Sequence, residues 1–169
     1  MYDLSKVVVT SSPHIKAEDD TRSLMLDVVL ALIPALAVAI FTFGFRALVI
    51  TVATILSCVI FELLYCKAVH KPSTIGDLSA VVTGILIAFN VPVAAPLWMP
   101  VIGGAFAIIV VKMLFGGIGK NFMNPALAAR CFLLISFAGK MTNFSYSGFD
   151  GISGATPLAV LKSGGEVNI

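Results

Sequence analysis

The stretch LMLDVVLALIPALAVAIFTF, residues Leu24–Phe43, decides the fold class of this chain. Its 20 residues form about 30 Å of α-helix, which is enough to cross the hydrocarbon core of a bilayer. We expect Ser23 as its N-cap, and Asp27 is tolerated near the positive helix end. Pro34 lies at mid-span and is expected to kink the helix. The stretch predicts a transmembrane helix as the first element.

The composition of the whole chain agrees with this prediction. Of 169 residues, 59% are hydrophobic and 12% are charged, whereas a soluble domain carries about 25% charged residues. A soluble enzyme, a disordered chain and a nucleic-acid binder are therefore disfavoured. The net charge of +2 is too small to indicate a polyanionic partner.

Four further apolar runs follow the first one, at residues 47–64, 78–97, 101–115 and 124–138. The run 78–97 is uninterrupted only to Phe89, and its 12 clean residues reach only about 18 Å. Asn90, Pro92 and Pro96 then predict a break, which at membrane depth must be shielded by protein or line a cavity. We predict an all-α, polytopic membrane protein with about five transmembrane helices, some of them short or broken.

Several residues are expected at helix ends or helix contacts. Asp77 can cap the helix that follows it, and Asn124 with Pro125 forms a good helix start. Gly103 and Gly104 permit close packing between helices. Trp98 suits a membrane interface.

Three charged residues lie in or beside the apolar runs. Glu62 is either an interfacial acid beside a snorkelling Lys67 or an ion-pathway carboxylate. Lys112 is expected to snorkel from a helix end. Arg130 should face protein or a polar cavity, as a member of a structural ion pair or in contact with a bound anionic cofactor.

The three cysteines, Cys58, Cys66 and Cys131, show no metal-binding spacing. They are expected to be buried small hydrophobic residues. The alternative is that one of them joins iron–sulfur ligands from another subunit, since a cluster normally takes four thiolates.

The polar residues 1–23 show no secretory signal and are expected to form a tail beside the membrane. With five crossings and the N-terminus inside, seven basic residues fall in inside segments and three fall outside. The inside residues are Lys6, Lys16, Arg22, Lys67, Lys71, Lys112 and Lys120, and the outside residues are Arg46, Lys140 and Lys162. The positive-inside rule therefore places the N-terminus in the cytoplasm and the segment after residue 138 outside.

Two motifs resemble a known family. GGIGKNFMNPALAAR at Gly116–Arg130 is similar to a loop and helix start in RnfD, a membrane component of the Rnf electron-transport complex that is related to NqrB of the sodium-pumping quinone reductase. DGISGATPL at Asp150–Leu158 resembles the flavin attachment motif of that family. The resemblance extends over the whole chain from Ser11 onward.

The resemblance implies that the Thr156 hydroxyl is joined by a phosphoester to the phosphate of FMN. Gly154 and Ala155 would leave space for a flavin phosphate, and Pro157 would fix the chain direction as a helix starts. The full set of implied cofactor-binding residues is Ser153, Gly154, Ala155, Thr156, Pro157 and Leu158, with Arg130 and Asn124 as weaker candidates. The alternative for Thr156 is a helix N-cap that binds no flavin.

The resemblance further implies an electron-relay subunit of a ferredoxin:NAD oxidoreductase complex that couples electron transfer to Na⁺ or H⁺ translocation. Its expected partners are the lipid bilayer and other membrane subunits, including a second flavin-bearing subunit and iron–sulfur subunits. Non-covalent riboflavin is a further expected cofactor, and no catalytic residue or metal site is expected. The sequence shows no dinucleotide-binding glycine fingerprint. The alternative function is a small-solute transporter or channel component without a redox cofactor.

Members of that family are about twice as long, so we expect this chain to form half of a larger helical bundle. The expected organisation is a cytoplasmic tail at 1–23, a transmembrane domain at 24–138 and an extracytoplasmic flavin-attachment loop with a truncated C-terminal part at 139–169. The expected location is the cytoplasmic (inner) membrane of a prokaryotic cell. The sequence does not identify the coupling ion.

Overall fold

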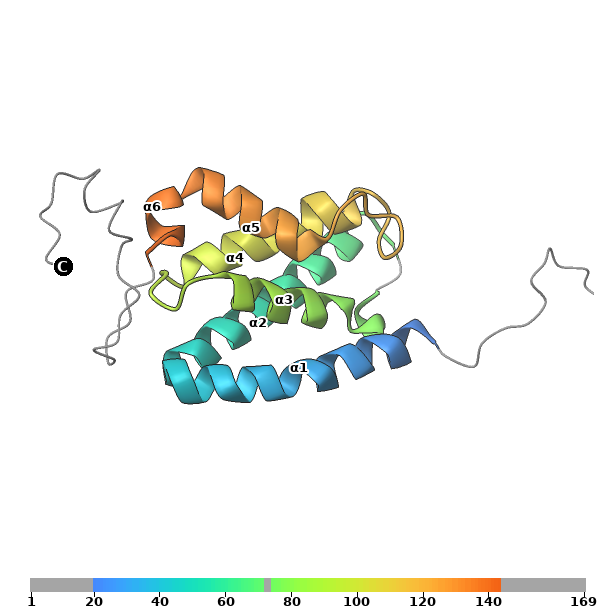
Figure 1. Ribbon diagram of the computed structural model, residues 1–169. Helices are drawn as coiled ribbons and strands as arrows, with labels where there is room; N and C mark the ends of the chain where they lie inside the picture. The colour runs from blue at the N-terminus through green and yellow to red at the C-terminus, as the bar shows by residue number, and fades with distance from the viewer. Residues whose placement is uncertain (1–19, 72–73, 144–169) are drawn as a thin grey trace, which may run out of the picture.

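The computed structural model describes residues 20–71 and 74–143, and within these ranges it consists of helices and turns without strands. The described elements are α1 (Thr21–Phe43), α2 (Phe45–Ala68), the 3-10 turn η2 (Ile75–Asp77), α3 (Ser79–Asn90), α4 (Trp98–Ala105), the π-helical segment η3 (Phe106–Met113), α5 (Pro125–Ser136) and α6 (Ala138–Met141). Figure 1 shows the longer helices lying roughly side by side, with chain turns gathered at the two ends of the bundle.

Helix α1 begins earlier than expected from the sequence. Its N-cap is Asp20, whose Oδ1 accepts a hydrogen bond of 2.8 Å from the Thr21 backbone N–H. The prediction of Ser23 as N-cap was therefore wrong, because a carboxylate three residues upstream already satisfies the helix start. The helix continues through Pro34, and none of its residues is buried within the described chain.

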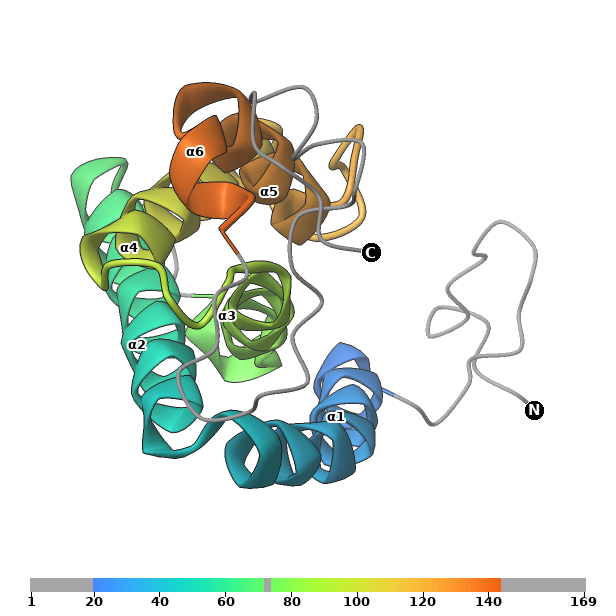
Figure 2. The ribbon, with the colours of Figure 1, turned by 60° about the vertical axis from the view of Figure 1, so that its left-hand side comes forward.

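A single glycine reverses the chain between α1 and α2. Gly44 has a φ of 74°, a backbone conformation that favours glycine because it has no Cβ. Helix α2 then runs beside α3 and α4, as the view along the bundle in Figure 2 shows. Its buried hydroxyls at Thr51 and Thr54 donate to backbone carbonyls four residues earlier, so this polar surface is satisfied inside the helix.

Helix α3 ends at Asn90, as the sequence predicted, and a non-helical connection leads to α4 at Trp98. Arg46 holds this connection against the α1–α2 turn. Its Nε donates to the Val93 carbonyl at 2.7 Å, and its Nη2 donates to the Ala95 carbonyl at 3.1 Å. Arg46 thus supplies hydrogen-bond donors to the Val93 and Ala95 carbonyls, which have no helical partner in this connection.

Glycines allow the central helices to approach closely. A Cβ on Gly84 of α3 would lie 2.7 Å from the Ile55 Cα of α2, and one on Gly104 of α4 would lie 2.5 Å from Ser57 Oγ. Gly103 packs in the same way against Leu133 of α5. The expected close packing at Gly103 and Gly104 is confirmed.

Helix α5 starts as the sequence predicted. The Asn124 Oδ1 accepts from the Ala126 N–H at 2.9 Å, and Pro125 occupies the first turn. Phe137, which connects α5 to α6, packs edge-to-face against Trp98, with ring centroids 5.1 Å apart. The Lys140 Nζ lies 4.8 Å from the centre of the Trp98 ring.

Two described helices, α1 and α2, are long and apolar enough to cross a membrane, and three shorter apolar helices accompany them. Apolar side chains on α1 are widely exposed, including Phe41 at 94% and Val38 at 65%. An all-α membrane protein with short and broken apolar helices is thus confirmed. The turns at 43–45, 91–97 and 137–143 lie at one end of the bundle in Figure 1, and those at 69–78 and 114–124 lie at the other.

Candidate functional site

The motif expected to carry the flavin lies outside the described residues. Ser153, Gly154, Ala155, Thr156, Pro157 and Leu158 all follow Asn143, where the described part of the chain ends. The two weaker candidates, Asn124 and Arg130, are both described. Asn124 acts as the N-cap of α5, and its predicted contact with a cofactor stays a prediction.

Arg130 lies on α5 and reaches the last residue of α3. Its Nη1 donates to the Asn90 Oδ1 at 2.9 Å, while the Asn90 Nδ2 donates to the Leu86 carbonyl at 2.7 Å. The side chain of Arg130 is exposed. Among the described residues, the only ion pair joins two other side chains, Lys112 and Glu62, so Arg130 meets a neutral amide there and no carboxylate.

A cavity of about 290 Å³ opens beside this arginine. Its lining is mostly apolar, with Arg130, Asn90 and Thr142 as the polar side chains. The apolar part comes from four segments: the end of α1, the end of α3 with its connection, α5, and α6. The expectation of a structural ion pair for Arg130 is not met among the described residues, Arg130 lines a cavity that is mostly apolar, and its predicted contact with an anionic cofactor stays a prediction.

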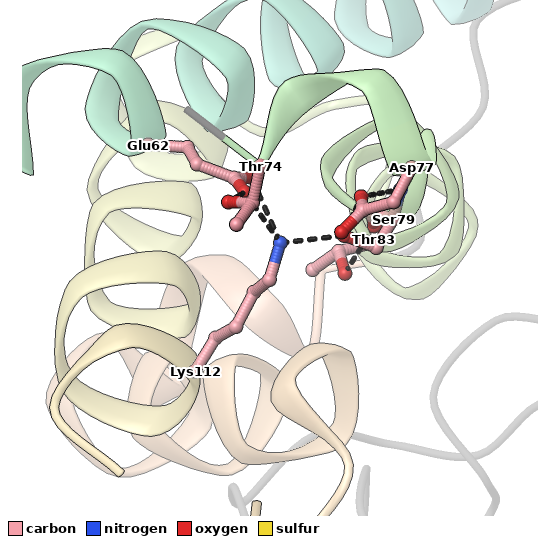
Figure 3. Close-up of polar contacts among 6 residues, drawn as sticks. All are labelled: Glu62, Thr74, Asp77, Ser79, Thr83 and Lys112. Carbon is pink, nitrogen blue, oxygen red and sulfur yellow. Dashed lines mark hydrogen bonds and ion pairs between the residues drawn. The ribbon is translucent and has the colours of Figure 1, made fainter. Parts of the chain in front are cut away.

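A second polar cluster lies at the opposite end and joins α2, α3 and η3 (Figure 3). The Lys112 Nζ donates to both carboxylate oxygens of Glu62, at 2.9 and 2.8 Å, and to the Ser79 Oγ at 2.5 Å. The Thr74 hydroxyl also donates to Glu62. Glu62 is 0% exposed and Lys112 is 1% exposed.

The cluster continues from the buried pair toward the surface. The Ser79 hydroxyl and backbone N–H both donate to the Asp77 Oδ1, at 2.6 and 2.9 Å. The N-cap of α3 is Leu78, so Asp77 lies one residue earlier than the expected cap, but its carboxylate receives the backbone N–H of Ser79, the first residue of α3. The Glu62 carboxylate contacts the ammonium group directly and the Asp77 carboxylate reaches it through Ser79, so the buried charge of Lys112 is compensated.

The interpretation of Glu62 as an acid beside Lys67 and the prediction that Lys112 snorkels were both wrong, whereas the ion-pathway alternative for Glu62 stays a prediction. Glu62 pairs with Lys112, 50 positions away, and not with the neighbouring Lys67, which is exposed. Lys112 does not snorkel to the surface, because a buried carboxylate and a hydroxyl receive its ammonium group. The signal in the sequence was one acid and one base, each near the end of an apolar run, which is the pattern of a compensated pair.

The cysteines differ in exposure. Cys58 and Cys66 are buried, which confirms their interpretation as small core residues, whereas Cys131 is exposed. The interpretation was wrong for Cys131, because this residue lies on an exposed side of α5.

Comparison with known proteins agrees with the motifs at residues 116–130 and 150–158. The model of the NQR2, RnfD, RnfE family matches residues 8–168. The chain is 52% identical over 159 residues to the D component of the Na(+)-translocating ferredoxin:NAD(+) oxidoreductase complex of Acetobacterium woodii, a match that covers 94% of this chain and 50% of that protein.

More distant relatives have similar names. The D component of the proton-translocating ferredoxin:NAD(+) oxidoreductase complex of Clostridium ljungdahlii is 38% identical over 91% of this chain and 47% of that protein. The D component of the ion-translocating oxidoreductase complex of Shewanella sediminis is 37% identical over 92% of this chain and 54% of that protein. The chain thus spans about half the length of the curated relatives it matches. Because the family model covers nearly all of its residues, the chain belongs to the NQR2, RnfD, RnfE family.

Proposed function

We propose that this chain is part of an electron-relay subunit that carries covalent FMN on Thr156. The subunit would act in a membrane complex that transfers electrons between ferredoxin and NAD and couples this transfer to Na⁺ or H⁺ translocation. The observation that carries the proposal is the Ser153–Thr156 motif, SGAT, in a chain whose family model extends across it. The names of relatives matched over nine-tenths of this chain support the same role.

In the proposed subunit the flavin and the protein chain have different roles. The flavin supplies the redox chemistry, and the chain holds the flavin at a fixed place in the membrane. A bundle with close glycine contacts and a compensated buried ion pair is a suitable rigid support for such a group. Non-covalent riboflavin within the same subunit stays part of the proposal, without assigned residues.

The proposed partners are the remaining membrane subunits of an Rnf-type complex, among them a second flavin-bearing subunit and iron–sulfur subunits. The relatives are named as components of complexes, which supports assembly with other chains. Extensive exposed apolar surface on α1 supports burial against lipid or protein.

We place the subunit in the cytoplasmic (inner) membrane with its N-terminus in the cytoplasm and the flavin loop outside. Lys112 is buried in an ion pair, so it no longer counts among the basic residues on the cytoplasmic side. Six basic residues inside against three outside still favour the same orientation.

The test of the cofactor is flavin fluorescence in a denaturing gel, combined with mass spectrometry of the peptide that contains Thr156. We expect a fluorescent band and a mass increment equal to FMN on Thr156 when the protein is made with its maturation machinery. Thr156→Val removes the hydroxyl at nearly constant shape, so its band should be dark.

Thr21→Val is the matched control, because it also removes a threonine hydroxyl, one that is exposed at the start of α1 and does not line the cavity beside Arg130. Its band should remain fluorescent. A dark wild-type band would refute the flavin proposal and favour the transporter or channel function, which needs no chromophore. Fluorescence that persists in Thr156→Val would place the attachment elsewhere.

A further inference from the structure

The guanidinium of Arg130 lacks an anionic partner within the described residues. Its one hydrogen bond to those residues goes to the Asn90 side chain, although a guanidinium carries five N–H donors. Of the four described acids, Glu62 is engaged with Lys112, and Asp77 lies with it at the opposite end of the bundle. Asp20 and Asp27 belong to the first part of α1, which begins at that same opposite end. An arginine among apolar helices is costly unless an anion or water compensates it.

Asn90 fixes the direction in which this positive charge points. Because its Nδ2 is bound to the Leu86 carbonyl, its Oδ1 is turned toward Arg130. The contact orients the guanidinium and leaves its charge unneutralised. Asn90 is thus a positioning residue for the arginine. It is the last residue of α3.

The cavity beside Arg130 has the character of a binding site for an amphiphilic anion. Its walls include the aromatic rings of Phe43 and Phe89 and the apolar side chains of Pro92 and Leu134. The Thr142 hydroxyl at its edge donates to the Ala138 carbonyl. An apolar cavity with a few convergent polar groups is the usual form of a small-molecule site, and arginine suits phosphate because of its forked donors.

We propose that Arg130, oriented by Asn90, binds the phosphate group of a molecule whose apolar part occupies this cavity. Two sources would supply that chemistry: a flavin phosphate and a phospholipid headgroup. The flavin source rests on the function proposed above, and the phospholipid source is independent of it. The cavity includes Thr142, which precedes Thr156 by 14 positions in the sequence.

The test uses the full-length subunit in its purified complex, as wild type, Arg130→Gln, Arg130→Lys and Lys140→Gln. Lys140→Gln is the matched control, because it removes an exposed positive charge nearby that lies over Trp98 and does not line the cavity. Three quantities are measured: covalent flavin per chain, fluorescence anisotropy of that flavin, and phospholipid phosphorus retained after detergent washing. Arg130→Gln should lower occupancy of the site about tenfold or more, and Arg130→Lys should lower it less.

The pattern of loss identifies the source. A fall in flavin content or anisotropy at unchanged phospholipid supports the flavin phosphate, and loss of phospholipid at unchanged flavin supports the headgroup. Asn90→Asp tests the site without removing the arginine, because a carboxylate beside Arg130 neutralises it internally and should displace the phosphate. If Arg130→Gln fails to assemble, Asn90→Asp still shows whether the site binds a phosphate.

The outcomes separate this proposal from the preceding one. A wild-type complex without covalent flavin refutes the proposed function, and the phospholipid measurement then decides the phosphate site alone. Wild-type complex with flavin, combined with unchanged flavin and phospholipid in both Arg130→Gln and Asn90→Asp, overturns the phosphate site and leaves the flavin attachment intact. Equal losses in Lys140→Gln would also overturn it, since they would reflect surface charge in general.

Discussion

The residues that distinguish this molecule from a generic apolar bundle are its few charged side chains in apolar surroundings. The buried pair of Glu62 and Lys112 is fully compensated by direct contacts, whereas Arg130 is held by a neutral amide. The first arrangement holds helices together at one end, and the second leaves positive charge facing a cavity at the other end. Charged side chains thus join helices at one end and leave a positive group beside a cavity at the other.

The buried pair gives a stability prediction for single residues. Lys112→Met leaves the Glu62 carboxylate buried without its ammonium partner, which should lower the free energy of unfolding by about 3–5 kcal/mol. Unfolding of the full-length subunit in detergent, followed by circular dichroism, measures this loss. Lys67→Met, an equal change at an exposed lysine of α2, should shift stability by less than about 1 kcal/mol.

A double variant checks the cause of that loss. Glu62→Met combined with Lys112→Met removes both charges, so most of the stability should return, because no uncompensated charge stays buried. Glu62→Met alone is measured as well. If the double variant loses as much stability as Glu62→Met and Lys112→Met lose together, packing of the side chains and not their charge is responsible.

At the scale of elements, the sequence predicted where helices exist better than what their faces contact. Apolar length located the spans, Pro92 and Pro96 located the break after α3, and Asn124 with Pro125 located the start of α5. Contacts across 50 positions, such as that of Glu62 with Lys112, could not be read from local periodicity. The segment η3 is π-helical, so the 3.6-residue period does not indicate which side Lys112 faces.

The contact between α2 and α3 gives the second prediction. Gly84→Ala places a Cβ 2.7 Å from the Ile55 Cα, and a backbone atom cannot move aside as a side chain can. The two helices must separate, which should cost about 1–3 kcal/mol of unfolding free energy. The same detergent unfolding experiment measures this cost.

Gly139→Ala is the matched control for this substitution. Gly139 is also helical, and a Cβ there would have no neighbour within 4 Å. Its stability should be unchanged or higher, because alanine reduces the freedom of the unfolded chain. Equal destabilisation by both substitutions would mean that close approach of α2 and α3 is not the cause.

At the scale of the whole molecule, the two polar sites occupy opposite ends of one bundle. The Glu62 cluster lies with the turns at 69–78 and 114–124, and the Arg130 cavity lies with the turns at 43–45 and 91–97 (Figure 1). Alternating helix direction alone predicts this distribution of the turns between the two ends for any bundle of spanning helices. The side of the membrane that each end faces rests on the distribution of lysine and arginine.

Cysteine labelling from either side of the membrane tests this orientation. In a Cys131→Ser background, which removes the exposed thiol, Lys71→Cys and Lys120→Cys should react with a membrane-impermeant maleimide only from the cytoplasmic side. Lys140→Cys, at the other end of the bundle, should react only from outside. Labelling of all three from one side would contradict a bundle whose ends face opposite compartments, and the reverse assignment would move the predicted flavin loop to the cytoplasm. Because Arg130 and Thr142 share the cavity at the Lys140 end, this labelling also fixes which leaflet could supply a headgroup phosphate.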